Sequence, residues 1–135
     1  MNAKVFVYGT LKKGYNNNRI LEKDTFIDEA LTKDSFYMTT CGFPYLIPSL
    51  FAQEFGKKCH KAKGEIYEVS EETLQRLDFL EGVKYGHYSR EVIQCHLNNG
   101  DIVETFVYIP VIKSEALEFP EVNIITNKEA NYYEF

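Results

Sequence analysis

The sequence contains little of several residue types, and each scarcity excludes a class of protein. Its 135 residues include no tryptophan and only three cysteines, Cys41, Cys59 and Cys95. An odd number of widely spaced cysteines does not form a disulfide framework, and reduced thiols suit a cytoplasmic protein. No apolar stretch approaches the length of about 20 residues that a membrane-spanning helix requires, and Lys4 interrupts any signal-peptide core. We therefore expect a cytoplasmic protein that does not associate with a membrane.

Positive charge and metal-ligand patterns are scarce as well. The chain has 15 Lys and Arg residues against 20 Asp and Glu residues, which gives a net charge of −5. Basic residues gather only at residues 12–13 and 57–63, both expected in solvated loops, so no concentrated basic face is available for nucleic acid. Two Cys-His doublets, at residues 59–60 and 95–96, place neighbouring side chains on opposite faces of a strand. No CxxC or HxxxH pattern accompanies them. We expect no nucleic-acid partner, no metal and no cofactor.

Aromatic residues are abundant, with ten Tyr and ten Phe, and the composition is 44% hydrophobic and 26% charged. This composition and length predict a single globular domain over residues 1–135. Strands are predicted at residues 4–8, 25–33, 35–39, 62–69, 87–97 and 102–109, with an edge strand or ordered loop at 42–48 and a short helix at 18–21. Asn-Gly within residues 98–101 predicts a hairpin, whereas the tail from residue 113 gives no clear pattern. The fold class predicted is α+β, a small mixed β-barrel-like sheet with one main helix and short helices.

The run VFVYGTLKKG, residues 5–14, is a strand that stops at a glycine turn. Its apolar residues are continuous, which predicts burial on both faces. Gly9 and Gly14 have the spacing of a phosphate-binding loop, but Tyr15 and Asn16 stand where that loop needs Lys and Ser or Thr. A strand-to-glycine turn can leave several N–H groups converging on an anion or oxyanion. The alternative is a tight turn whose N–H groups meet water, and both interpretations stay open at this point.

The segment SEETLQRLDFLEG, residues 70–82, predicts the main helix, with a serine cap at its start and a glycine just past its end. Its buried face is defined by leucines at three-residue spacing: Leu74, Leu77 and Leu80. Glu81 falls on the same stripe of the helical wheel. A carboxylate in such a position is paired or has a raised pKa, and a raised pKa suits a general acid and base near neutral pH.

Glu81 also has an ordinary interpretation. It lies in the last helical turn, where fraying lets it reach water, and Lys84 or Arg90 can pair with it. Arg90 can equally pair with another acid or steer a substrate carboxylate. Asp78, at the edge of the apolar stripe, is interpreted as a structural acid.

Three sets of motifs occur in a specific order and spacing. VFVYGTLKKG at residues 5–14 is followed by Asn-Arg-Ile-Leu at 18–21, LDFLEG occupies 77–82, and Tyr-Ser-Arg at 88–90 precedes Phe-Val-Tyr at 106–108. Together they resemble the gamma-glutamylcyclotransferase superfamily, nearest its gamma-glutamylamine cyclotransferase-like branch. The resemblance covers residues 4–109, while residues 57–63 and the tail after Pro110 find no clear match.

The resemblance implies a compact β-barrel whose cavity holds a small-molecule γ-glutamyl substrate. It implies Glu81 as the catalytic residue and the following substrate-binding residues: Tyr8, Gly9, Thr10, Leu11, Tyr88 and Tyr108. The implied reaction releases 5-oxoproline and a free amine by intramolecular amine attack, with Glu81 as general acid and base and no cofactor. The alternative is a non-catalytic small-molecule-binding or inhibitory protein with an occluded Glu81. The leaving amine and the oligomeric state stay open.

Overall fold

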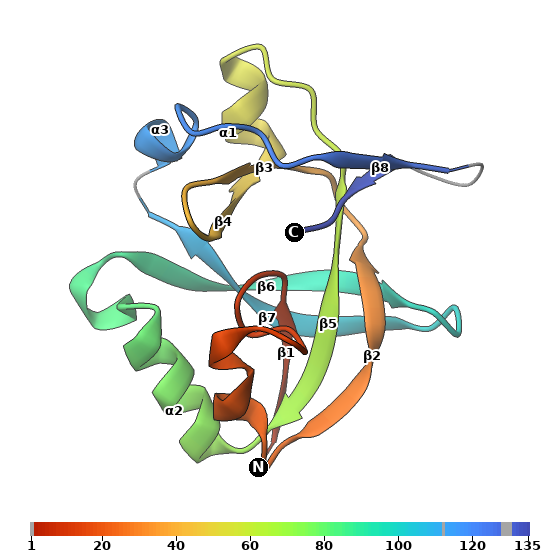
Figure 1. Ribbon diagram of the computed structural model, residues 1–135, viewed down its shortest axis with the longest axis vertical. Coiled ribbons are helices and arrows are strands. Elements are labelled where there is room, and N and C mark those ends of the chain that lie inside the picture. The colour runs from red at the N-terminus through yellow and green to blue at the C-terminus, as the bar shows by residue number, and fades with distance from the viewer. Residues whose placement is uncertain (1, 112, 128–130) are drawn as a thin grey trace.

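Five strands close into a barrel in the computed structural model, which describes residues 2–111, 113–127 and 131–135 (Figure 1). The strand order is β1 (Ala3–Val7), β7 (Ile102–Pro110), β6 (Tyr88–Leu97), β2 (Thr25–Thr32) and β5 (Lys61–Val69). The barrel closes because β1 pairs with β7 on one side, in parallel, and with β5 on the other, antiparallel. The predicted α+β fold with a β-barrel-like sheet is confirmed.

Strand β1 is buried on both faces, as its continuous apolar sequence predicts. Val5 and Val7 pack in one core cluster together with Leu77 of the main helix. Phe6 and Tyr8 pack in a second cluster. Successive side chains of a strand point to opposite faces, so β1 forms part of both clusters. The strand ends at Val7, one residue earlier than predicted, and Tyr8 already belongs to the segment that leads into the turn.

The main helix α2 (Glu71–Leu80) begins and ends where its sequence predicts. The Ser70 side chain accepts a hydrogen bond from the Thr73 N–H, and Gly82 takes the left-handed backbone conformation with φ of 66°. Left-handed backbone favours glycine, so the helix cannot continue. Glu81 is the C-cap residue. Leu80 was predicted on the buried face but is 42% exposed, because the helix reaches the rim of a cavity at this residue.

The predicted hairpin is confirmed: β6 and β7 pair antiparallel, and Gly100 in the turn has φ of 92°. The segment predicted as an edge strand or loop is strand β4 (Pro44–Pro48), which pairs with β3 (Phe36–Thr40) in a separate two-stranded sheet. Helix α1 (Ser49–Glu54) was not predicted, since six residues without a side-chain cap give little periodicity. The predicted helix at residues 18–21 is a 3-10 helix, η1 (Asn16–Leu21).

The tail contains elements that its sequence did not indicate. They are α3 (Lys113–Ala116), β8 (Ile124–Thr126) and β9 (Asn131–Tyr133). Outside the tail, a second 3-10 helix, η2 (Val83–Tyr85), lies between α2 and β6. Strand β9 pairs in parallel with β5, and the Tyr133 side chain is fully buried. Figure 1 shows α1, α3 and β3–β4 gathered at the end of the barrel opposite the N-terminus. Among the described residues, no helix combines the length and apolar character needed to cross a membrane.

Candidate active site

The turn after β1 is fixed by hydrogen bonds from its own loop. The Lys12 N–H donates to the Gly9 carbonyl at 3.0 Å, and the Asn17 N–H donates to the Thr10 carbonyl at 3.1 Å. The Asn17 side-chain amide also donates to the Thr10 hydroxyl at 2.9 Å. Within the part of the chain that the structure describes, the N–H groups of Thr10 and Leu11 have no acceptor. Two fixed donors are therefore available to a ligand.

Gly9 is required at this turn by the close approach of β4. A Cβ atom at position 9 would lie 2.8 Å from Cγ and 2.9 Å from Cδ of Pro44. Both are ring atoms of a rigid side chain, so the contact cannot be relieved by a rotamer change. The turn and the start of β4 therefore form a wall that only glycine permits.

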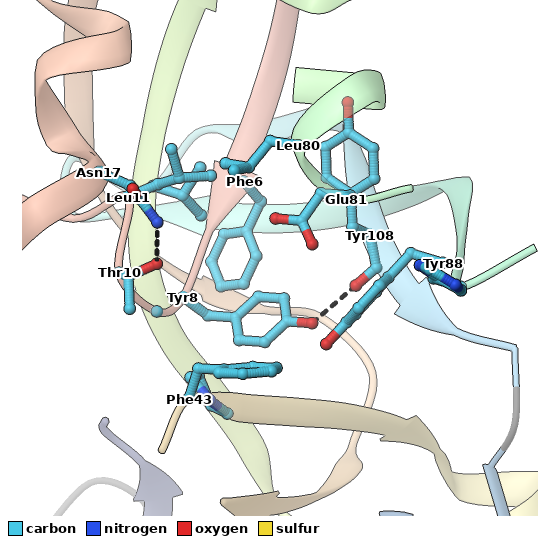
Figure 2. A pocket seen from close by; sticks show the side chains of 14 residues that line it. Phe6, Tyr8, Thr10, Leu11, Asn17, Phe43, Leu80, Glu81, Tyr88 and Tyr108 are labelled. Carbon is cyan, nitrogen blue, oxygen red and sulfur yellow. Dashed lines mark hydrogen bonds between the residues drawn. The ribbon is translucent and has the colours of Figure 1, made fainter. Parts of the chain in front are cut away.

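A cavity of about 340 Å³ opens beside this turn. All the residues predicted for the site line it together: Tyr8, Gly9, Thr10, Leu11, Glu81, Tyr88 and Tyr108. Figure 2 shows the Glu81 carboxylate among the rings of Phe6, Tyr8 and Tyr88, with Thr10 and Leu11 across the cavity. The barrel thus brings together residues that lie far apart in the sequence, from β1 and its turn, the end of α2, β6 and β7.

The Glu81 side chain is half-buried, and its carboxylate is uncompensated. Among the described residues no side chain forms an ion pair or a hydrogen bond with it. Arg90, one of the two partners considered from the sequence, instead donates to Asp78 at 2.8 Å. Burial raises the pKa of Glu81 from its ordinary value of 4.5 to about 7. Because desolvation is the sole cause of this shift, the proton is exchanged close to neutral pH, as a general acid and base requires.

Asp78 is a structural acid, as predicted, and its contacts explain the shape of the cavity. It accepts a hydrogen bond from the Tyr108 hydroxyl at 2.7 Å in addition to the ion pair with Arg90. The Tyr108 carbonyl in turn accepts a hydrogen bond from the Tyr8 hydroxyl at 2.6 Å (Figure 2). Burial raises the pKa of both phenols, so each keeps its proton. This chain fixes the end of α2 against β7, one helical turn before Glu81.

Stacked aromatic rings form the opposite wall of the cavity. The Tyr88 ring lies parallel to the Tyr45 ring, with 6.3 Å between centroids and 8° between planes. Phe43 and Phe119 each pack against Tyr45 at 5.2 Å. Phe119 comes from the tail, so the tail supports this wall. Phe43 itself lines the cavity and is 46% exposed at its mouth.

Several cavity residues were not predicted as site residues: Asn17, Phe43, Pro44, Leu80 and His87. The sequence around Phe43 and Pro44 indicated an edge strand or loop, but nothing in it indicated which face of the barrel this segment covers. His87 lies at the cavity because its main-chain N–H donates to the Gly82 carbonyl at 3.1 Å, which places it directly after the helix end.

A second cavity, of about 360 Å³, is lined by the next residues of the same turn. Lys12 and Lys13 line it together with Glu29, Lys63, Glu65 and Glu134. Lys63 pairs with Glu29 at 3.1 Å and with Glu134 at 3.6 Å. Lys12 was expected in a solvated loop but is only 8% exposed, because its ammonium donates to the Phe135 main-chain oxygen. Burial lowers the pKa of Lys12.

Metal ligation has no geometric basis in the described residues. No group of three or more His, Cys, Asp or Glu side chains there is arranged to hold a metal ion. The three cysteines are unpaired, and Cys95 is buried beside Thr105 in the barrel.

Comparison with known proteins identifies the family of this chain. A sequence model of the family described as "Gamma-glutamyl cyclotransferase, AIG2-like" matches residues 5–124. The chain is 36% identical over 118 residues to gamma-glutamylaminecyclotransferase of Rattus norvegicus, covering 78% of this chain and 76% of the relative. It is 40% identical over 116 residues to gamma-glutamylaminecyclotransferase A of Danio rerio, covering 77% and 66%. A crystal structure of an AIG2-like protein from Mus musculus is similar with a TM-score of 0.72 and 31% identity, covering 89% of this chain and 85% of that one.

The family match extends further than the motifs predicted. The resemblance seen in the sequence ended at residue 109, whereas the family match continues to residue 124 and includes the part of the tail that carries Phe119. The fold agrees with the structural comparison. The chain belongs to the gamma-glutamyl cyclotransferase, AIG2-like family.

Proposed function

We propose that this protein is a cyclotransferase that converts a γ-glutamyl amide into 5-oxoproline and a free amine. The observation that carries the proposal is the half-buried, uncompensated Glu81 carboxylate in the same cavity as the turn with free N–H groups. One proton-exchanging group and a few fixed dipoles are sufficient for this reaction, since nucleophile and electrophile belong to the same substrate molecule.

The proton transfers follow from the position and pKa of Glu81. The ionised carboxylate takes a proton from the α-ammonium group of the γ-glutamyl moiety. The freed amine attacks the γ-carbonyl carbon of the same molecule, and a C–N bond closes the five-membered ring. When the bond to the leaving nitrogen breaks, Glu81 returns its proton to that nitrogen. It then takes the remaining extra proton from the positively charged ring nitrogen and passes it to the released amine, which leaves as an ammonium ion. A pKa of about 7 suits both directions of transfer at neutral pH.

The turn after β1 supplies the fixed dipoles. The free N–H groups of Thr10 and Leu11 are assigned to the negative oxygens of the substrate, its α-carboxylate and the oxyanion that develops at the γ-carbonyl. Their positions are set before the substrate arrives, because Asn17 and the Lys12–Gly9 hydrogen bond hold the turn. Donors that need no reorganisation contribute most to the rate.

Tyr8, Tyr88 and Tyr108 are assigned as walls that hold the γ-glutamyl chain folded upon itself. Their side chains line the cavity beside Glu81 and limit the access of water to the carboxylate. Holding the amine close to the γ-carbonyl turns the ring closure into a pre-oriented intramolecular step, which accounts for a large part of the expected acceleration. The three unpaired cysteines suit a reducing, cytoplasmic setting for this activity.

The test is 5-oxoproline release from a panel of γ-glutamyl compounds whose leaving groups are an amino acid, the ε-amine of lysine and a polyamine. We expect release by the wild type and a fall in turnover of about 100-fold or more for Glu81→Gln, which keeps the shape and loses the base. The matched control is Glu29→Gln, which removes a carboxylate of the second cavity and should keep turnover within about twofold.

Two results would speak against the proposal. Wild-type turnover in a folded Glu81→Gln protein would remove Glu81 from the reaction. No release from any compound, with binding that survives the substitution, would favour the non-catalytic binding protein instead.

A further inference from the structure

Three phenol groups surround the Glu81 carboxylate, and two of them are already committed within the protein. The Tyr8 hydroxyl donates its hydrogen to the Tyr108 carbonyl at 2.6 Å. The Tyr108 hydroxyl donates to Asp78 at 2.7 Å. Each phenol has a single hydrogen to donate, so neither is available to a substrate without breaking a contact that shapes the cavity.

The third phenol, that of Tyr88, is not committed. Its hydroxyl forms no hydrogen bond with any residue in the described ranges 2–111, 113–127 and 131–135. Its ring is nevertheless held, since it is stacked on Tyr45, which Phe43 and Phe119 support from other sides. Figure 2 shows the Tyr88 hydroxyl beside that of Tyr8, at the edge of the cavity that contains Glu81. The Tyr88 hydroxyl is thus a fixed but unused donor.

We propose that Tyr88 is a second catalytic residue, whose hydroxyl donates a hydrogen bond to the γ-carbonyl oxygen of the substrate as this oxygen becomes an oxyanion. The proposal rests on the proposed cyclotransferase function and deepens it. It divides the work among three groups. Glu81 transfers the protons, the turn N–H groups bind the α-carboxylate and one side of the oxyanion, and Tyr88 adds a further donor to the oxyanion.

The chemical balance of the step is simple. As the substrate amine forms its bond to the γ-carbon, the π electron pair of the carbonyl moves to oxygen. Tyr88 shares its hydrogen with that oxygen but keeps it, and the electron pair returns when the bond to the leaving nitrogen breaks. The phenol is neutral before and after the step, so Tyr88 takes no part in the proton transfers, which Glu81 carries out between the ring nitrogen and the leaving nitrogen.

The surroundings keep Tyr88 in the form that can donate. Burial, followed by the charge of Glu81 and by Tyr45, raises the pKa of the Tyr88 phenol well above its ordinary value of 10.0. The Glu81 and Tyr88 side chains line the same cavity (Figure 2), so both can act on one substrate. A neutral donor beside a carboxylate is stable, whereas a second anion there would repel both the base and the oxyanion.

The experiment compares the kinetics of wild type and Tyr88→Phe on the best γ-glutamyl substrate of the panel. Phenylalanine keeps the ring and its stack on Tyr45, so folding and substrate binding should be preserved. We expect kcat to fall about 100-fold with KM changed less than about threefold, because one oxyanion donor is lost and ground-state contacts are kept. Tyr85→Phe, which removes the hydroxyl of a neighbouring tyrosine that is 69% exposed, is the matched control and should leave both constants unchanged.

A second measurement separates a catalytic from a structural role. The ring carbonyl of 5-oxoproline is the former γ-carbonyl, so titration of folded protein with 5-oxoproline should show about fivefold weaker binding to Tyr88→Phe than to wild type. Unchanged kcat in Tyr88→Phe would overturn the proposal while the cyclotransferase function stands. A fall in kcat with a parallel rise in KM and equal product binding would overturn it in favour of a wall function. Failure of the wild type to release 5-oxoproline from any compound would overturn the proposed function and this inference together.

Discussion

Two cavities of nearly equal size are lined by consecutive residues of one turn, and they differ in how charge is balanced. The first, of about 340 Å³, contains one carboxylate, Glu81, among aromatic rings. The second, of about 360 Å³, contains three lysines and three glutamates, and its Lys63 is paired with two of those acids. Burial raises the pKa of Glu81 to about 7, whereas Glu29 and Glu134 are each paired with Lys63. The raised pKa of Glu81 arises from burial without a partner, not from a high density of charge.

The largest effect is expected from Glu81→Gln, which removes the uncompensated charge of the first cavity and should change how the free energy of unfolding depends on pH. Between pH about 4.5 and 7, folded protein keeps a proton on Glu81 that the unfolded chain releases, so the free energy of unfolding falls as pH rises through this window. Glu81→Gln has no such loss. We compare the free energy of unfolding of the variant with that of the wild type at two pH values. The difference, variant minus wild type, should be larger by up to about 3 kcal/mol at pH about 8 than at pH about 4.

Urea denaturation of both proteins at the two pH values measures this gain. Glu29→Gln is the control from the second cavity, and removal of its half-exposed carboxylate should change stability by less than about 1 kcal/mol. If the difference in free energy of unfolding between wild type and Glu81→Gln stayed constant with pH, the pKa of Glu81 would not be raised in the folded protein.

The raised pKa of Glu81 should also determine how turnover depends on pH. Only the ionised form of Glu81 accepts the substrate proton, so kcat should fall about tenfold per pH unit below about 7, or about 100-fold between pH 7 and 5. Release of 5-oxoproline at saturating substrate provides the profile. A kcat that stays constant down to pH about 5 would mean that Glu81, with its raised pKa, is not the base in the reaction.

The smallest expected effect concerns the turn that the two cavities share. Gly9→Val drives a side chain into the Pro44 ring and displaces the N–H groups of Thr10 and Leu11, so KM should rise about tenfold. Steady-state kinetics on a variant shown to be folded by circular dichroism measures this rise. Adding Pro44→Ala removes both ring atoms of the clash and should recover part of the affinity. Unchanged KM in folded Gly9→Val would remove the turn from the substrate site.

Local signals in the sequence predicted the parts of the site that depend on chain neighbours. The serine cap and the glycine stop of α2 fixed where the helix ends, which placed Glu81 at its last turn. The continuous apolar residues of β1 predicted a strand buried on both faces, and Asn-Gly predicted the hairpin of β6 and β7. Each of these features is determined within a few residues, so a pattern is sufficient to detect it.

Features that depend on contacts between elements far apart in the sequence could not be predicted from local patterns. The wall made by Phe43 and Phe119 requires β4 and the tail to meet, and the burial of Lys12 requires the chain near Phe135 to return to the turn. Helical periodicity placed Leu80 in the core because it takes no account of where the neighbouring barrel ends. Such contacts are decided by packing between elements far apart in sequence, which no local pattern records.

The cavity lies between two parts of the molecule that are attached differently: β1 with its turn, and the segment of β3 and β4. Hydrogen bonds from β5 and β7 bind β1 into the closed barrel, so its amides should exchange with solvent only when the whole barrel opens. The facing wall is carried by β3 and β4, a two-stranded ribbon that pairs outside the barrel. Phe43 stands just before β4 at the mouth of the cavity and is 46% exposed. We therefore expect molecules to enter and leave past Phe43, while the donors of the turn keep their positions.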